Sequence, residues 1–547
     1  MLRPEKCLGF LTFFLALLLP VLGCSFDAAK RRVDPQTFRM ALGAEPPLLD
    51  PQLSDTGVSV FIVKQVLSTL FQYDSQQRIR PYDAQSYEWQ QQGRRLHVIV
   101  RADLHWSDGV PLDACHYRDG ILRALEPKMP STLADLFEDI RGAAEYKKGK
   151  LQGSQVGVLC DAKLQSLTFD VLRPYSSKLL HALAFVISAP IRKERVEKFG
   201  ESWLLGNSQV KPLGTGAYVI SEWSHDRRVR LKSRASLGEQ HLAIDRVAKV
   251  ANIDLPIVKE LNTTFAMYES GELDVLDDLS PTLVPKLKGR SDFIVAQYPT
   301  TYFVGFSLKA NPVLKDKKVR QALAFSAGQF EVPNLLKGGE REAKGWVYPD
   351  LLPDSAQPQQ SLYDLPRAKK LLAEAGYGAG HPLPKLVLSY NSGERHQLLM
   401  ERLVFRWKTD LGIEVDLNPM DWKLLVSQVK TKPSDLYRYA WNAVYPDALF
   451  FLELFQSQGL NNFGGWSNKE FDELLASLES TSMEHRDESY AKKLSRAQDI
   501  LVHDDPALIP IYHYSKNCLL KPYVKNLRWN LMGMTPLREV EIQGVKN

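Results

Sequence analysis

The segment Asp435-Leu-Tyr-Arg-Tyr-Ala-Trp-Asn-Ala-Val-Tyr-Pro-Asp-Ala-Leu-Phe-Phe451 is the most informative stretch of the chain. Side chains of a β-strand alternate between its two faces, so one face is predicted to carry four aromatic residues: Tyr437, Tyr439, Trp441 and Tyr445. The other face is predicted to carry Arg438 and Asn442. Pro446-Asp447 ends the strand because proline has no N–H for a sheet. An apolar run of helical length follows, from Ala448 to Phe455.

A strand, a turn and a helix in this order often form the edge at which an α/β sheet binds its ligand. Alternating aromatic residues are also typical of a buried sheet face, and periodicity alone first favours that interpretation. From the residues alone, the segment is therefore either a wall of a binding site or part of a core.

Immediately before this segment, strands alternate with helices. Apolar patterns predict a strand over 385–390, a helix over 394–411, a strand over 413–417 and a helix over 421–430. Leu399, Leu403, Trp407 and Leu411 recur at four-residue steps along the first helix, as one buried face would. This alternation predicts an α/β lobe with a mostly parallel sheet.

Earlier in the chain, the patterns are those of turns. The run His105-Trp-Ser-Asp-Gly109 predicts a tight turn, in which the Asp bonds its own backbone and the Gly adopts a positive φ. Asp113 is then a candidate N-cap for a helix that continues to Leu125. Pro212 to Tyr218, with two glycines around Thr215, predicts a turn that leads into a strand. A helix is also expected from Val58 to Phe71.

Several of these motifs resemble, in the same order, those of one known family. Trp441 to Asp447 resembles the Trp-x-Ala-Asp-Tyr-Pro-Asp-Pro segment of the extracytoplasmic solute-binding proteins that deliver oligopeptides and dipeptides to ABC importers. Trp106 to Ala114 resembles its Trp-Ser-Asp-Gly-x-Pro motif, and Pro212 to Tyr218 its Pro-x-Gly-Thr-Gly-Pro-Tyr motif. The resemblance spans about residues 38–531.

This resemblance implies an α/β, two-lobed fold of the periplasmic-binding-protein type. An additional small domain (the three-domain, cluster C type) and a hinge beside a ligand cleft between the lobes are expected. The expected parts are a signal peptide at residues 1–23, lobe I at 24–75 and 206–300, the small domain at 76–205, lobe II at 301–508, and a return to lobe I at 509–547.

The resemblance also implies where the ligand binds. We expect one wall of the site to consist of Arg438, Tyr439, Ala440, Trp441, Asn442, Ala443, Val444, Tyr445 and Asp447. Trp441 is expected to be the main stacking surface. Arg438 is expected to offer a fixed donor fork to a ligand carboxylate.

Val444 departs from the family pattern. In the family, an Asp at this position pairs with the α-ammonium of the ligand, and an unpaired buried ammonium costs roughly 3–5 kcal/mol. Either Asp447, Asp421 or another acid receives the ammonium, or the ligand has none. An oligopeptide is the first expectation. A cell-wall peptide, a blocked peptide, a sugar, or a sensor or scaffold role in the envelope without transport remain alternatives.

The N-terminus has the pattern of an export signal. Arg3 and Lys6 precede an apolar run from Leu8 to Leu22, as in a secretory signal peptide. Val21-Leu-Gly-Cys24 resembles the bacterial lipobox, which predicts a lipidated Cys24 and a membrane-anchored protein on the periplasmic or extracytoplasmic face of the cell envelope. A plain signal peptide and an uncleaved anchor are the alternatives, and the membrane of residence stays open.

Composition excludes several other classes. A chain of 547 residues with 44% hydrophobic and 24% charged residues is typical of a globular protein of two or three domains. A net charge of +5 without long basic runs gives no sign of nucleic-acid binding. We expect a monomer whose partners are a small solute, the subunits of an ABC permease and, through Cys24, the membrane.

No catalytic or metal-binding pattern stands out. Ser208-x-x-Lys211 and Ser427-x-x-Lys430 lack the companion motifs of penicillin-binding enzymes, and neither H-E-x-x-H nor G-x-S-x-G occurs. The histidines, methionines and cysteines show no metal-ligand spacing. We therefore expect no enzyme activity, no cofactor and no metal. Beyond Cys7 and Cys24, three cysteines remain (Cys115, Cys160 and Cys518), so at most one disulfide is possible, and its partners stay open.

Overall fold

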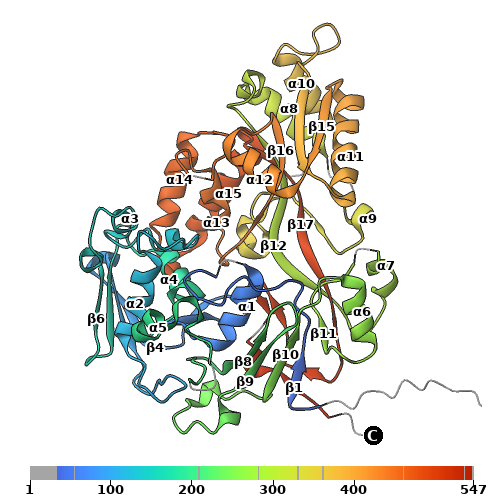
Figure 1. Ribbon diagram of the computed structural model, residues 1–547. Helices are drawn as coiled ribbons and strands as arrows, with labels where there is room; N and C mark the ends of the chain where they lie inside the picture. Colours follow the sequence, from blue (N-terminus) through green and yellow to red (C-terminus); the bar gives the residue numbers. More distant parts are fainter. Residues whose placement is uncertain are drawn as a thin grey trace, which may run out of the picture.

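The computed structural model of the protein describes residues 34–544, except for 55, 75, 207–209, 281, 329–331, 360–361, 460 and 535. The signal peptide expected at 1–23 and the lipidated Cys24 lie outside these residues. The fold is α/β with several sheets, in a lower part, a side part and an upper part (Figure 1). Within the described residues, no helix combines the length and the apolar character that crossing a membrane requires.

The lower part contains a four-stranded sheet in the order β1-β10-β9-β8. Its strands are β1 (Thr37–Arg39), β8 (Tyr218–Ser224), β9 (Arg228–Ser233) and β10 (Asn252–Pro256). Helix α1 (Gly57–Val66) packs beside β8. The helix predicted to reach Phe71 ends five residues earlier, because the chain turns to form β2 (Phe71–Tyr73), which pairs with β3 (Ile79–Pro81).

The side part has its own antiparallel sheet, in the order β4-β5-β7-β6. Its strands are β4 (Ala84–Gln90), β5 (Arg95–Val100), β6 (Val158–Asp161) and β7 (Ser166–Asp170), and its helices are α2 (Ala114–Ala124), α3 (Ala143–Lys147), α4 (Ser177–Leu183) and α5 (Lys193–Phe199). The predicted turn and cap before α2 are confirmed. Gly109 has φ +88°, and the Asp113 side chain accepts from the backbone N–H groups of Cys115 and His116.

A seven-stranded sheet, β11-β17-β12-β16-β14-β15 with β13 beside β17, forms the centre of the upper part and extends into the lower part at β11 (Figure 1). The strands are β11 (Val275–Leu276), β12 (Phe293–Phe306), β13 (Arg341–Glu342), β14 (Leu386–Asn391), β15 (Val415–Met420), β16 (Leu436–Asn442) and β17 (Leu508–Leu520). The predicted alternation is confirmed, with α11 at Glu394–Leu411 and α12 at Trp422–Thr431, and β14 is parallel to both β15 and β16. The prediction of a mostly parallel sheet is wrong, because β12 and β17 run antiparallel to their neighbours.

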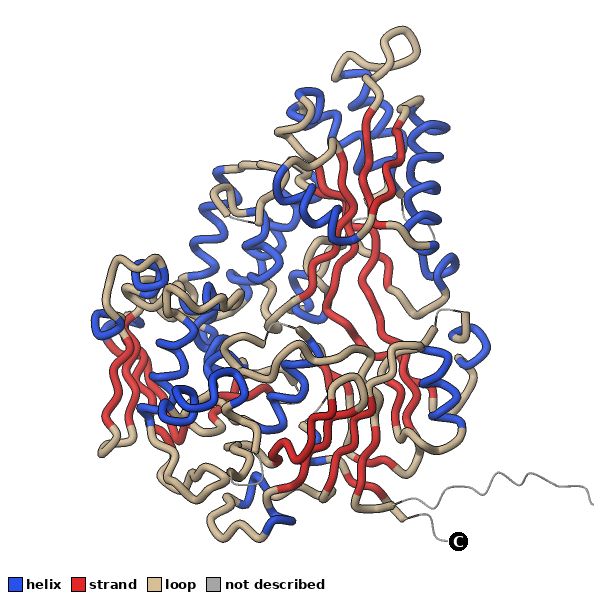
Figure 2. The backbone as a smooth tube through the Cα atoms, viewed as in Figure 1, coloured by secondary structure: helices blue, strands red, loops and turns tan. Residues whose placement is uncertain are grey.

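Strands β12 and β17 are the longest in the described chain, with 14 and 13 residues. They run side by side from the lower part into the upper part (Figures 1 and 2). Near the lower end β17 pairs with β11, and near the upper end β12 pairs with β16. Their register shifts between Gln297 and Thr301 and again between Tyr302 and Phe303. This irregular stretch lies where the two parts meet.

The remaining helices complete the two parts. They are α6 (Leu261–Glu269) and α7 (Val284–Leu287) in the lower part, and α8 (Lys317–Ala327), α9 (Val332–Leu336), α10 (Leu365–Glu374), α13 (Leu449–Leu452), α14 (Lys469–Glu479) and α15 (Glu488–Asp499) in the upper part. The Asn468 side chain caps α14 by accepting from the backbone N–H of Phe471. The C-terminal strands β18 (Val524–Lys525), β19 (Trp529–Asn530), β20 (Gly533–Met534) and β21 (Glu541–Ile542) lie in the lower part.

The upper sheet separates two apolar clusters, and β16 contributes to both. Tyr437 and Tyr439 belong to the cluster that includes Trp346 and Phe451, whereas Leu436 packs with the cluster around α8 and α11. The predicted alternation is confirmed for Tyr437 and Tyr439, but β16 ends at Asn442, before Pro446, so the prediction that Tyr445 shares their face is wrong. Tyr445 lies beyond the end of the strand and belongs instead to the large cluster shared by the lower and side parts.

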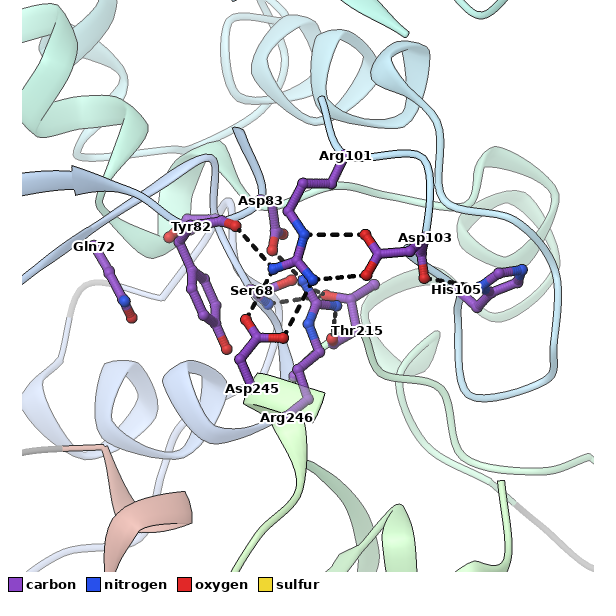
Figure 3. Close-up of polar contacts among 12 residues, drawn as sticks. Ser68, Gln72, Tyr82, Asp83, Arg101, Asp103, His105, Thr215, Asp245 and Arg246 are labelled. Atoms are coloured by element: carbon purple, nitrogen blue, oxygen red, sulfur yellow. Dashed lines mark hydrogen bonds and ion pairs between the residues drawn. The ribbon is translucent and has the colours of Figure 1, made fainter. Parts of the chain in front are cut away.

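Buried ion pairs join the side part to the lower part (Figure 3). Asp83, just before β4, pairs with Arg246, and both side chains are almost fully buried. Arg246 also donates to the carbonyl of Thr215, in the turn before β8. Arg101, after β5, bridges Asp103 and Asp245 at 2.7 and 2.9 Å. Removing one partner of a buried pair is strongly destabilising, so the Asp83–Arg246 pair fixes the two parts to each other, and the partly exposed Arg101–Asp245 pair adds a second link.

The side part is also crosslinked. Cys115 at the start of α2 and Cys160 in β6 form a disulfide that spans 45 residues, while Cys518 is a buried free thiol. We expect the double variant Cys115→Ser/Cys160→Ser to lose about 2–4 kcal/mol of unfolding free energy, because the unfolded chain gains loop entropy.

The measurement is urea unfolding followed by circular dichroism. Cys518→Ser, which removes a thiol without breaking a crosslink, is the control for loss of a sulfur atom. Equal midpoints for the oxidised wild type and the double variant would contradict a stabilising disulfide at this position.

Candidate functional site

A cleft of about 550 Å³ lies where the lower part meets the end of β16. Its walls come from segments far apart in the sequence: residues 40–43, α1, Phe185, 258–264, 275–278, Gln297 and Tyr298 of β12, Asn442 to Val444, Lys516 of β17, and 529–534. The irregular stretch of the two long strands therefore forms part of the wall. A cleft of this size and composition is typical of a small-molecule site.

Helix α1 contributes one wall. The lining residues Val58, Phe61 and Lys64 follow one another at three-residue steps, so they share a face of the helix. Lys64 is exposed to the cleft, and its ammonium lies 5.4 Å from the centre of the Phe185 ring. Desolvation by the surrounding protein lowers the pKa of Lys64 to about 8. The next residue, Gln65, is fixed by hydrogen bonds to the Phe61 carbonyl and the Leu537 N–H.

Two carboxylates lie at the other side of the cleft, after β11. Asp277 pairs with Lys516 and accepts a hydrogen bond from Trp529 Nε1 at 2.7 Å. Asp278 is exposed and accepts the N–H of Leu279 at 2.9 Å. Burial of the carboxyl raises the pKa of Asp278, with Lys516 opposing that shift. Asp277 is thus engaged by the protein, and Asp278 has no ion-pair partner in the described chain.

Three of the predicted site residues line this cleft: Asn442, Ala443 and Val444. Thr300 Oγ1 donates to Asn442 Oδ1 at 2.8 Å, and the Ala443 N–H donates to the Pro299 carbonyl at 2.9 Å. Both contacts attach this segment to the crossing strand β12. Val444 is half-buried and presents a neutral, apolar side chain.

The structure places Tyr439, Ala440 and Trp441 outside the residues that line the cleft. Trp441 stacks on Phe450 and donates from Nε1 to its carbonyl at 3.2 Å. Tyr439 stacks on Trp422. Asp421, proposed as a substitute acid, is also absent from the lining. The aromatic residues Tyr439 and Trp441 thus pack against other aromatic rings of the protein.

Arg438 lies on the opposite face of β16. Its side chain is 4% exposed and lies over the Tyr302 ring, 4.1 Å from the ring centre. One guanidinium nitrogen donates to Asn391 Oδ1 at 2.6 Å and the other to Tyr514 Oη at 2.9 Å. Arg438 is therefore not among the residues that line the cleft, and its terminal donors are used within the protein.

Asp447 connects the upper part to the side part. It is buried, approaches His181 Nε2 of α4 at 3.3 Å and pairs with Arg486 at 2.9 Å. Burial opposes its ionisation, but Arg486 and His181 outweigh burial and hold the pKa of Asp447 well below its usual range. Tyr445 stacks on His181 with ring centres 4.6 Å apart. These partners occupy Asp447, so it does not replace the missing acid at position 444.

Further ion pairs extend this interface. Arg173 pairs with Glu479 at 2.7 Å, and Lys178 approaches Glu453 at 3.5 Å. Burial raises the pKa of Glu453 to about 7, with Lys178 opposing and Glu479 adding to the shift. The segment 435–451 thus contributes to the cleft through 442–444 and to this joint through 445–447, and Glu453 follows shortly after it.

Several cleft residues could not be identified from the sequence. Lys64, Asp277, Asp278, Tyr298 and Trp529 come from separate segments, and no local motif marks them. The only local signal was Lys64, a charge on an otherwise apolar side of α1. Across the described residues, no group of three or more His, Cys, Asp or Glu side chains is arranged to hold a metal ion.

Comparison with known proteins identifies the family. Residues 78–463 match the family described as bacterial extracellular solute-binding proteins, family 5 Middle. The chain belongs to this family. This membership agrees with the resemblance of the sequence motifs. It also indicates that the protein functions on the extracytoplasmic side of the membrane.

The relatives extend over nearly the whole chain. The chain is 28% identical over 519 residues to the periplasmic oligopeptide-binding protein OppA of Escherichia coli, covering 92% of each. It is also 28% identical over 501 residues to the probable deoxycholate-binding periplasmic protein YgiS of that organism, covering 89% of this chain and 90% of the relative. The unliganded open form of the murein tripeptide-binding protein MppA of Escherichia coli has the same fold, with a TM-score of 0.79, 24% identity and coverage of 93% and 98%.

Glu453 gives the joint a dependence on pH. A carboxyl whose pKa is about 7 in the folded protein and about 4.5 in the unfolded chain binds its proton more tightly when folded. Its contribution to stability is therefore lost as pH rises through this window. We expect the unfolding free energy of the wild type to fall between pH 4.5 and pH 7 by about 2 kcal/mol more than that of Glu453→Gln.

Urea unfolding at several pH values measures this difference. Glu488→Gln, at an exposed position on α15, is the matched control and should keep the wild-type slope. A Glu453→Gln curve parallel to the wild type would show that Glu453 is ionised normally in the folded protein.

Proposed function

We propose that this protein is the substrate-binding component of an ABC importer, that it captures peptides in the cleft and that it delivers them to a membrane permease. Family membership supports the solute-binding role, and the likeness to an oligopeptide-binding protein supports peptides as ligands. The observation that carries the proposal is the position of the cleft. It lies between α1 and the end of β16, beside the two strands that connect the lower and upper parts. We propose no enzymatic role.

Closure around the ligand is the proposed mechanism. We assign lobe I to residues 24–75, 206–300 and 509–547, the small domain to 76–205 and lobe II to 301–508. The irregular stretch of β12 near Tyr298 would act as the hinge, since few residues need to change φ and ψ there. A ligand that contacts both lobes favours the closed state by the difference between its affinities for the two states.

The ligand backbone has a natural place in this arrangement. Asn442 to Val444 continue from the end of β16 into the cleft, and an extended peptide can be held by main-chain groups in the way that a strand is held. Water between side chains and cleft walls accommodates ligands of different sequence. Trp441 would then support this wall through its contact with Phe450 instead of stacking on the ligand directly.

Membrane attachment is part of the proposal. Removal of residues 1–23 would leave Cys24 at the N-terminus, and its acyl chains would hold a monomer at the membrane surface. A Cys24→Ala variant is expected to appear in the soluble fraction, whereas Cys518→Ala should remain with the membrane. Equal partition of the two variants would contradict the lipid anchor.

A non-standard ligand is the second candidate, and Val444 favours it. This position offers no carboxylate to an α-ammonium, and Asp447 is occupied by His181 and Arg486. Two relatives carry names with other ligands: a murein peptide-binding protein, and a probable deoxycholate-binding protein. A cell-wall peptide, a blocked peptide or another amine-free solute is therefore the alternative to an ordinary oligopeptide.

Co-purified ligands test the proposal directly. We would express the protein from Ser25, purify it gently and record native mass spectra before and after denaturation. A ladder of short peptides supports peptide capture, and a single non-peptide mass supports the second candidate. A protein that is empty, and that neither peptide nor muropeptide pools stabilise in a thermal-shift screen, would contradict both and favour a sensor or scaffold role.

Filling the cleft should weaken ligand binding without unfolding the protein. We expect Val444→Trp to weaken binding of the co-purified ligand by about tenfold or more, because the indole takes up cleft volume. Isothermal titration calorimetry measures affinity, and the melting temperature checks the fold. Val247→Trp, at a position that is 41% exposed and outside the cleft lining, is the control. Equal affinity of both variants would exclude this cleft as the binding site.

A further inference from the structure

The cleft contains two lysines in different electrostatic situations. Lys516 on β17 is paired with Asp277. Lys64 on α1 has neither an ion-pair partner nor a hydrogen-bond acceptor among the residues that the structure describes, although it lines the same cleft. A cation directed into a cleft without a carboxylate of its own is available to an anionic ligand.

The surroundings of Lys64 strengthen this interpretation. Its ammonium lies over the Phe185 ring, and the lining of the cleft includes the apolar side chains of Val58, Phe61, Val444, Leu531 and Met532. Desolvation alone accounts for its lowered pKa, and no nearby acid contributes. An ion pair formed in such surroundings is less screened than one on an open surface.

The other charged residues of the cleft do not take the place of the aspartate that, in the family, pairs with the α-ammonium of the ligand. Asp277 is engaged by Lys516 and Trp529. Val444 brings no charge to the end of β16, where the resemblance places the acid that receives an ammonium. Asp278 is the one lining carboxylate in the described residues without an ion pair, so it is the competing anchor that an experiment must separate from Lys64.

We propose that Lys64 receives a carboxylate of the ligand, and that the cleft selects an acidic group attached to an apolar body instead of a free α-ammonium. This inference rests on the proposed function and specifies the ligand class of the same site. A peptide with an apolar sequence and a free C-terminus has this chemistry, and so does an amphipathic organic acid.

Arg438 does not compete for this role in the structure. Its two terminal nitrogens already donate to Asn391 and Tyr514, and it lies on the other face of β16. The ammonium of Lys64 retains its donors, and its flexible stem extends from one face of α1 into the cleft. Lys64 is therefore a specificity-determining residue of the proposed site.

Blocked ligands separate the possible anchors. Isothermal titration calorimetry at constant pH would compare the peptide Leu-Leu-Leu with its N-acetylated and C-amidated forms, and would include sodium decanoate as a non-peptide carboxylate. Loss of a charged hydrogen-bond partner predicts that amidation weakens binding about tenfold or more, while N-acetylation has little effect. Lys64→Met should weaken binding of the free carboxylates to the same extent, and in this variant amidation should make no further difference.

Three variants complete the design. Lys64→Arg should retain most of the affinity, and Lys163→Met, outside the cleft lining, should bind like the wild type. Asp278→Asn should leave the preference for a carboxylate unchanged. If N-acetylation and Asp278→Asn abolish peptide binding while amidation does not, the inference is overturned and the proposed function stands. The inference is overturned in the same way if peptides bind but Lys64→Met loses no affinity for them.

The remaining outcomes distinguish the two proposals. Binding of decanoate that depends on Lys64, without binding of any peptide, would support the inference and reject peptides as the ligand class. Failure of all four probes to bind the ligand-free wild type would overturn the inference. If peptide and muropeptide pools also fail to stabilise the same protein in the thermal-shift screen, the proposed function is contradicted independently of the inference.

Discussion

The antiparallel pairing of β12 with β17 is the constraint on which the two-part architecture depends. At the lower end β17 pairs with β11, and at the upper end β12 pairs with β16, so the ladder between β12 and β17 connects the two parts. The ladder is irregular around Pro299 and Pro510, whose missing N–H groups cannot join it. Cleft residues lie next to this irregularity, and any change in its geometry alters the distance between α1 and the end of β16.

The segment 435–451 serves three purposes along its length. Its first half fills cores on both faces of the upper sheet, 442–444 line the cleft, and 445–447 form a buried joint with α4. Some residues, such as Ala443, both pack in a core and line the cleft, but others have a single role. A side chain that is held by His181 and Arg486, as Asp447 is, cannot also reach a ligand. The motif shared with the family therefore indicates a region of which only residues 442–444 line the cleft.

Local features were predictable from the sequence because local physics decides them. The Gly109 turn, the Asp113 cap, the alternation along β16 and the helix at 394–411 each depend on residues close in sequence. Long-range features were not. His181 and Asp447 are 266 residues apart, and Lys64 meets Val444 in one cleft only through the tertiary fold. The direction of β12 and β17 likewise made the upper sheet mixed, since strand direction depends on connections outside the βα repeat.

The Cys115–Cys160 disulfide can form only at a certain stage in the life of the protein. Thiols stay reduced in the cytosol and form disulfides in oxidising compartments. During synthesis, α2 and β6 are therefore joined only by noncovalent contacts, and the chain can be kept extended enough to cross a membrane. The covalent link forms after passage. The crosslinked side part therefore belongs only to the extracytoplasmic form of the protein.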